Sequence, residues 1–197
     1  MMKTTSKIGI VTTLFLGLAF ASRAQTTAPA GSSTGSSSSG NEWRLSVGPE
    51  VGLPIAGFSN AYSWYIGGSA QLDIPVANKL YVTVNAGYED LMVKNGEFPG
   101  RNLQLIPAKA GLKYFLLDNF LYVQAQAGAT FLGNKTDALA DKSAGFTYSP
   151  QVGVLLKIAN KNYIDVGFRY EQVVNGFYNG GTNLSTLGLR VAYTFGL

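Results

Sequence analysis

Residues 121–131 read LYVQAQAGATF, and this stretch carries two different chemistries on its alternate positions. The apolar positions are Leu121, Val123, Ala125, Ala127, Ala129 and Phe131, and the residues between them are Tyr, Gln, Gln, Gly and Thr. Because successive side chains of a β-strand point to opposite faces, this alternation predicts a strand with one apolar and one polar face.

The same alternation recurs in seven further segments between Trp43 and Leu197, for example through Tyr62, Trp64 and Ile66. None of the apolar-face positions is charged, and aromatic residues lie toward the ends of the segments. Short connections alternate with long ones along the chain. Transmembrane barrels carry aromatic girdles at both interfaces, short periplasmic turns and longer external loops. We therefore predict an all-β fold, an eight-stranded antiparallel up-and-down transmembrane β-barrel.

The composition favours the same class. Only 13% of the residues are charged and 46% are hydrophobic, whereas soluble domains carry about 25% charged residues. Eight glycines, one in each segment, fall on the polar face, where they let a narrow barrel close without crowding. A soluble lipocalin-type barrel is the alternative, but its outer polar face would be rich in Lys and Glu. Here that face is mostly small or uncharged, as expected of a narrow lumen.

Ten charged residues on the polar face are the candidate site, which we interpret as an internal cluster of salt bridges rather than a selectivity site or proton path. They are Arg44, Glu50, Asp73, Glu89, Lys109, Lys113, Asp165, Arg169, Glu171 and Arg190. Pro49, Pro107 and Pro150 interrupt the segments. We expect a bulge at Pro49, and we expect Pro107 and Pro150 at the outer ends of their strands.

The N-terminal part predicts export. Residues 1–24 have a basic start, an apolar run of about 13 residues and small residues before Gln25, as in a cleaved secretory signal peptide. Residues 25–41 form a Gly/Ser/Thr-rich linker that we expect to be disordered, and 42–197 form the barrel. Lys3, Lys7 and Arg23 supply most of the net charge of +4, so we expect no nucleic-acid partner.

The segments VGPEVGLP (47–54), NAGYED (85–90), IPAKAGLKYF (106–115) and LRVAYTFGL (189–197) resemble small outer-membrane barrels of the OmpX and OmpA transmembrane-domain type. In detail they are similar to the glycine-rich outer-membrane β-barrel domain family common in Bacteroidota. The resemblance covers residues 43–197. It implies that Gly188, Val191, Tyr193 and Phe195 belong to the signal by which the barrel-assembly machinery recognises its substrates, and it supplies no catalytic residues.

The chain contains no Cys and no His, which excludes disulfides, thiolate or imidazole metal sites and imidazole bases. We therefore expect no enzyme activity, no metal and no cofactor. We expect a monomeric outer-membrane protein, in contact with lipid and lipopolysaccharide, that has an anchoring, structural or loop-presenting role. Loops 135–143 and 175–183, the latter with Phe177 and Tyr178, are the candidate binding loops. Passive passage of small solutes or ions is one alternative, and a His-free outer-membrane lipid hydrolase is another.

Overall fold

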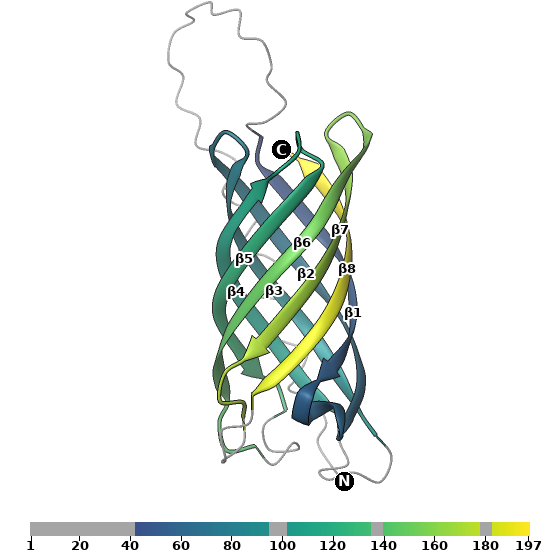
Figure 1. Cartoon of the computed structure of the whole chain (residues 1–197), viewed down its shortest axis with the longest axis vertical. Helices are drawn as coiled ribbons and strands as arrows, with labels where there is room; N and C mark the ends of the chain where they lie inside the picture. Colours follow the sequence, from purple (N-terminus) through teal and green to yellow (C-terminus); the bar gives the residue numbers. More distant parts are fainter. Residues whose placement is uncertain (1–41, 95–101, 135–139, 178–182) are drawn as a thin grey trace, which may run out of the picture. The chain divides into compact units, whose positions relative to one another are not determined.

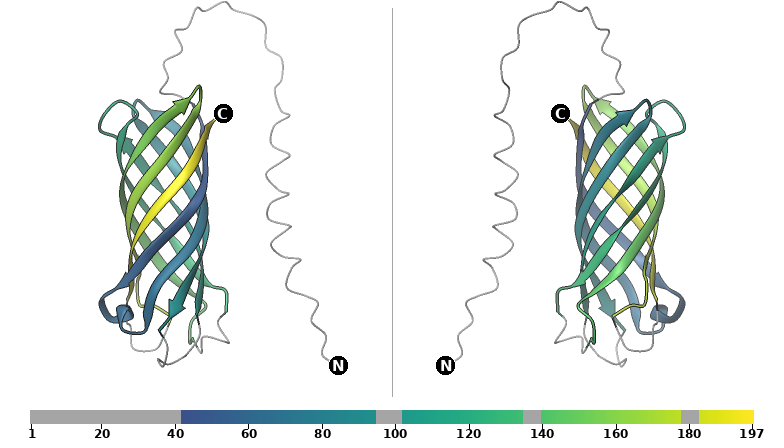
Figure 2. Two further views of the ribbon diagram at one scale, coloured as in Figure 1. Left: turned by 90° about the vertical axis from the view of Figure 1, so that its right-hand side faces the viewer. Right: turned by 90° about the vertical axis from the view of Figure 1, so that its left-hand side faces the viewer.

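The computed structural model describes residues 42–94, 102–134, 140–177 and 183–197. These residues form eight strands and one short 3-10 helix. The elements are β1 (Arg44–Ile55), η1 (Ala56–Ser59), β2 (Tyr62–Ala77), β3 (Leu80–Val93), β4 (Leu103–Phe115), β5 (Leu121–Leu132), β6 (Ala144–Ala159), β7 (Asn162–Val173) and β8 (Leu184–Gly196). Each strand pairs antiparallel with the next, and β1 pairs with β8 to close the barrel (Figures 1 and 2). The predicted eight-stranded antiparallel barrel is confirmed.

The barrel has two different ends. The tight β2–β3, β4–β5 and β6–β7 connections lie at one end, with the start of β1 and the end of β8; we call this the turn end (top of Figure 1). The β1–β2, β3–β4, β5–β6 and β7–β8 connections lie at the loop end. Among the described residues, no helix has the length and apolar character needed to cross a membrane.

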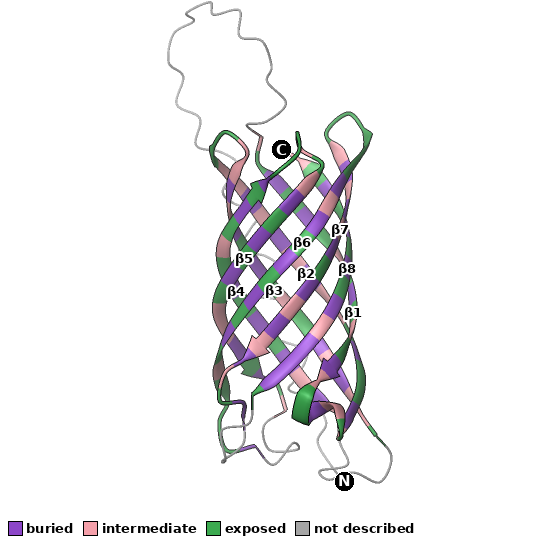
Figure 3. Cartoon of the chain, in the orientation of Figure 1, coloured by how far each residue is buried: buried purple, intermediate pink, exposed green. Residues whose placement is uncertain are grey.

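Burial alternates along every strand, as Figure 3 shows. Large apolar side chains such as Val47, Val123 and Phe168 are exposed on the outside, and the polar partners of the alternation are buried inside. Water offers no stabilisation to so large an apolar outer surface, whereas a bilayer does.

Tyr62 departs from the predicted alternation. It was expected on the outside, but it is only 2% exposed and belongs to an interior cluster. The pairing of β2 with β3 changes register between Tyr62 and Trp64, so one extra residue turns Tyr62 inward.

Two of the three prolines, Pro49 and Pro150, behave differently from the expectation. Pairs of β1 with β8 are missing at Gly48 and Pro49, yet the pairings on either side keep one continuous register, so the expected bulge is absent. Pro150 was expected at the outer end of its strand. It lies well inside β6, where it pairs with Ala125 of β5. Each proline lacks an N–H and so removes a ladder bond, but it adds no residue to the strand.

Two of the turns share a sequence and a geometry. Asn78-Lys79 and Asn160-Lys161 follow register shifts at the ends of β2 and β6, and both lysines have positive φ, 62° and 61°. This is a turn followed by a left-handed residue that forms a bulge. Lys79 donates a hydrogen bond to Asp118 on the neighbouring turn, which raises the pKa of the Lys79 ammonium and lowers the pKa of the Asp118 carboxyl.

Candidate functional site: the interior of the barrel

The interior contains all ten charged residues of the candidate site, each at most 5% exposed. They reach it because inward positions recur every second residue on each strand. Eight of them, all except Arg44 and Glu89, are joined by ion pairs across the middle of the barrel.

Two ion-pair groups occupy this middle region. Nearer the turn end, Lys113 Nζ lies 2.7 Å from Asp73 Oδ2 and 3.3 Å from Asp165 Oδ2. Arg190 connects this group to the second one, with Nη1 3.8 Å from Asp165 Oδ2 and Nε 3.3 Å from Glu50 Oε1.

In the second group, Arg169 Nη1 lies 2.9 Å from Glu50 Oε2. The ammonium of Lys109 pairs with Glu171, whose Oε2 also lies 3.9 Å from Arg169 Nη1. Removing one member of a buried pair leaves an uncompensated charge, so these residues depend on one another.

Neutral side chains satisfy much of the remaining hydrogen-bonding capacity. Tyr122 Oη donates to Asp165 over 2.6 Å, and Gln151 Nε2 donates to Tyr122 Oη over 2.6 Å. Gln71 and Gln124 exchange two amide hydrogen bonds of 3.1 and 3.2 Å across the lumen. Buried polar groups destabilise a fold unless they are hydrogen-bonded, and these pairs provide such bonds.

Arg44 closes the turn end. It is fully buried, and its guanidinium carbon lies 4.9 Å from the ring centre of Tyr81, 5.3 Å from that of Phe115 and 5.1 Å from that of Tyr163. Its Nη2 donates to Asn119 Oδ1 over 3.1 Å. The aromatic rings and the cation attract one another, so Arg44 and these rings fill the mouth as one unit.

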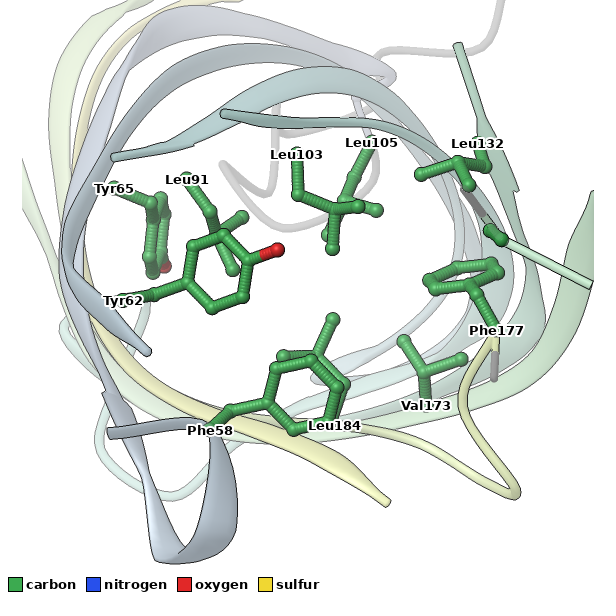
Figure 4. Close-up of a cluster of buried hydrophobic side chains, with 11 residues drawn as sticks. Phe58, Tyr62, Tyr65, Leu91, Leu103, Leu105, Leu132, Val173, Phe177 and Leu184 are labelled. Atoms are coloured by element: carbon green, nitrogen blue, oxygen red, sulfur yellow. The ribbon is translucent and has the colours of Figure 1, made fainter. Parts of the chain in front are cut away.

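An apolar cluster closes the loop end; we call it the loop-end cap (Figure 4). Its buried members are Phe58, Tyr62, Tyr65, Leu91, Leu103, Leu105, Leu132, Ala140, Val173, Phe177 and Leu184. Phe58 comes from η1, and Phe177 comes from the β7–β8 connection. The carbonyl of Phe177 accepts hydrogen bonds from the N–H groups of Asp141 (2.9 Å) and Lys142 (3.0 Å), which ties two loops together.

The cap corrects the expectation for Phe177. The sequence assigned this ring to a binding loop, but it is completely buried in the lumen. Tyr178, the other aromatic of that loop, and residues 135–139 lie outside the described residues. The sequence could have indicated this position, because burying a large apolar side chain from a loop in the adjacent barrel mouth stabilises the fold.

Two buried tyrosines, Tyr65 and Tyr122, were not assigned a role from the sequence. Tyr65 lies over Gly52 and Gly188, which are register partners, and Tyr122 lies over the partners Gly153 and Gly167. A methyl group on Gly188 would lie 1.9 Å from Tyr65 Oη. These four inward glycines therefore make room for the two rings, in the way that aromatic residues cover glycines in other sheets.

The proposed assembly residues lie together on β8 but face two ways. Val191, Tyr193 and Phe195 are exposed on the apolar exterior, and the rings of Tyr193 and Phe195 are 4.7 Å apart. Gly188 faces the lumen beneath Tyr65. Within the described ranges, no group of three or more His, Cys, Asp or Glu side chains is placed to hold a metal ion.

The sequence and the structure were compared with known proteins. No protein-family model matches the sequence, and neither does any curated protein. Among solved structures, the chain is similar to Neisserial surface protein A (NspA), with a TM-score of 0.55 and 14% identity over 79% of this chain and 97% of that one. It is also similar to the outer membrane protein OprG from Pseudomonas aeruginosa, with a TM-score of 0.53 and 11% identity over 80% and 96%. The chain has the fold of a small outer-membrane β-barrel.

This outer-membrane barrel fold explains why the apolar face of each strand points outward and the polar face points inward. A soluble barrel would bury its apolar residues, whereas this barrel exposes them and buries its charges. The lipocalin alternative is thereby excluded.

Proposed function

We propose that the protein is an integral outer-membrane barrel with a non-enzymatic role, anchored by its apolar exterior and presenting its loop end to the cell surface. The belt of exposed Val, Leu, Ile and Ala with aromatic residues toward both ends supports insertion in a bilayer. We further propose that it belongs to the glycine-rich barrel family of Bacteroidota, on the strength of the inward glycines and the four segments described above.

The observation that carries this proposal is the filled interior. Arg44 and its three rings occupy the turn end, the ion pairs occupy the middle and the loop-end cap occupies the other mouth. An eight-stranded barrel has an interior just wide enough for side chains. A porin-like role requires a water-filled path, so the filled interior favours an anchoring or loop-presenting role over passive passage.

We also propose how the protein is exported, assembled and partnered. Residues 1–24 direct export and are removed, and β8 is read by the barrel-assembly machinery through Val191, Tyr193 and Phe195. The mature protein is a monomer, surrounded by lipid and lipopolysaccharide. Its β5–β6 and β7–β8 loops are the binding surface.

Fractionation of cell envelopes tests the localisation, and a tag inserted among residues 135–139 tests the orientation. We expect the protein in the outer-membrane fraction, with a mature N-terminus near Gln25, and we expect the tag to be labelled on intact cells. Recovery in the soluble periplasmic fraction, or labelling only after cell lysis, would contradict the proposal. Deletion of residues 135–143, which also removes Ala140 and two hydrogen bonds from the loop-end cap, should abolish binding at the cell surface while the eight strands still form the barrel.

A further inference from the structure

The charges of the interior do not balance. In the described part of the chain, six carboxylates line the lumen or its turn-end mouth: Glu42, Glu50, Asp73, Glu89, Asp165 and Glu171. The cations there are five: Arg44, Lys109, Lys113, Arg169 and Arg190. Five of the carboxylates lie within 4.0 Å of a cationic nitrogen, and Glu89 is the one that does not, among the described residues.

Glu89 is also deeply buried, at 4% exposed. The charged and titratable groups that face it from the neighbouring elements are Glu50 on β1, Tyr65 on β2, Lys109 on β4, and Arg169 and Glu171 on β7. The two cations of this set already pair with Glu50 and Glu171. An ionised Glu89 would therefore add a negative charge beside two others.

The position of Glu89 connects this charge to the loop-end cap. Its register partner on β4 is Leu105, and Leu91 lies two residues further along the same face of β3; both belong to the cap. The Cγ of Glu89 lies against Gly67 of β2, where a methyl group would be 3.1 Å away. Glu89 thus lies at the boundary between the ion-pair network and the apolar cap.

We infer that Glu89 is a proton-binding residue, and that the proton it carries keeps the loop-end cap closed. A buried carboxyl without a counter-charge takes up a proton instead of remaining ionised. As a neutral acid it remains stable beside its neighbours Leu91 and Leu105. Once ionised it requires water or a counter-ion. Glu89 lies close to the loop end of β3 (Leu80–Val93) and next to cap residues, so the shorter route for either leads through the cap. Raising the pH therefore loosens the cap, and acid closes it.

The proton that Glu89 binds makes the stability of the barrel depend on pH. In the unfolded chain Glu89 is ionised above its ordinary acidic range, so folding takes up one proton. Stability then falls as pH rises, with an unfolding constant that increases by up to about tenfold per pH unit until the folded protein also releases the proton. The Glu89→Gln variant has no carboxyl at this position, so its stability should lack this contribution to the pH dependence.

Three chains are compared in the test: the full-length protein, Glu89→Gln, and Asp90→Asn as the matched control. Asp90 is the next residue on β3 and faces outward, where it accepts a hydrogen bond from Asn102 Nδ2. Infrared spectroscopy at neutral pH should show a protonated carboxylic acid band in the first and third chains and not in Glu89→Gln.

Hydrogen exchange of the Asp141 and Lys142 amides, which bond to Phe177 within the cap, reports the opening. After correction for the intrinsic rate, protection should fall at least about tenfold between pH 6 and pH 9 in the first and third chains, and stay constant in Glu89→Gln. An absent acid band, or the same pH response in Glu89→Gln, would overturn the inference. Steady conductance at acid pH would instead overturn the proposed anchoring role, so the two failures are distinguishable.

Discussion

Lys113 on β4 reaches past β3 to place its ammonium nitrogen 2.7 Å from Asp73 on β2, and the same nitrogen lies 3.3 Å from Asp165 on β7. One cation therefore holds together three strands that are distant in sequence. The ring of Tyr122 lies 4.5 Å from the same nitrogen, which adds a further attraction.

Lys113→Met should destabilise the folded barrel by about 3–5 kcal/mol, because it leaves Asp73 and Asp165 buried without their shared cation. Adding Asp73→Asn and Asp165→Asn to this variant should recover most of the loss. Lys157→Met, which removes an exposed lysine at the turn end, should change stability by less than about 0.5 kcal/mol. Urea unfolding in lipid vesicles measures all three. Equal effects of Lys113→Met and Lys157→Met would show that the pairs contribute nothing.

Gly188→Ala should destabilise the barrel by about 1–3 kcal/mol, because the new methyl group would lie 1.9 Å from Tyr65 Oη. Tyr65→Phe removes that oxygen and leaves the ring carbon at 3.1 Å, so the double variant should be more stable than the sum of the single changes predicts. Gly68→Ala is the control, since its methyl group meets only the Gly48 carbonyl at 3.5 Å. Strict additivity of Gly188→Ala and Tyr65→Phe would disprove the contact.

Phe177→Ala should cost about 3 kcal/mol, because it leaves a cavity in the loop-end cap. Phe177→Leu, which keeps most of the apolar volume, should cost less than about 1.5 kcal/mol. Chemical denaturation measures the loss, and faster hydrogen exchange at Asp141 and Lys142 locates it. If Phe177→Ala leaves both quantities unchanged, this ring does not close the lumen.

Val152→Arg should destabilise insertion by about 2–4 kcal/mol, the cost of a cation near the bilayer midplane. Ile158→Arg on the same strand lies close to the turn end, where the cost should fall to about 0–1 kcal/mol. Both side chains are exposed on the outside of β6. Folding yield and denaturant midpoint in vesicles compare them, and equal costs would mean that the apolar belt is placed wrongly.

The sequence predicted the fold because period-2 alternation is a local property that needs no knowledge of the partner strand. The exceptions come from non-local packing. Tyr62 is turned inward by an irregularity in its pairing with β3, and Phe177 is drawn into a mouth that only the closed barrel creates. Pro150 is accommodated inside β6 because it stays paired with β5, while the two pairs with β7 at Ser149 and Pro150 are absent.

The candidate site was predictable as a set of residues but not as a set of pairs. The inward position of Lys113 follows from counting along one strand. Its pairing with Asp165 depends on how eight strands are staggered around the barrel. The special position of Glu89 emerges only when the other carboxylates of the lumen and its turn-end mouth, within the described residues, have been matched with cations.

The central claim is that paired charges and two end clusters seal this barrel, and conductance across a planar bilayer tests it most directly. We expect the purified protein to insert and to give no steady current at neutral or acid pH. A steady, ion-selective conductance that changes when Lys113 or Glu171 is neutralised would contradict the claim and identify the interior as a channel.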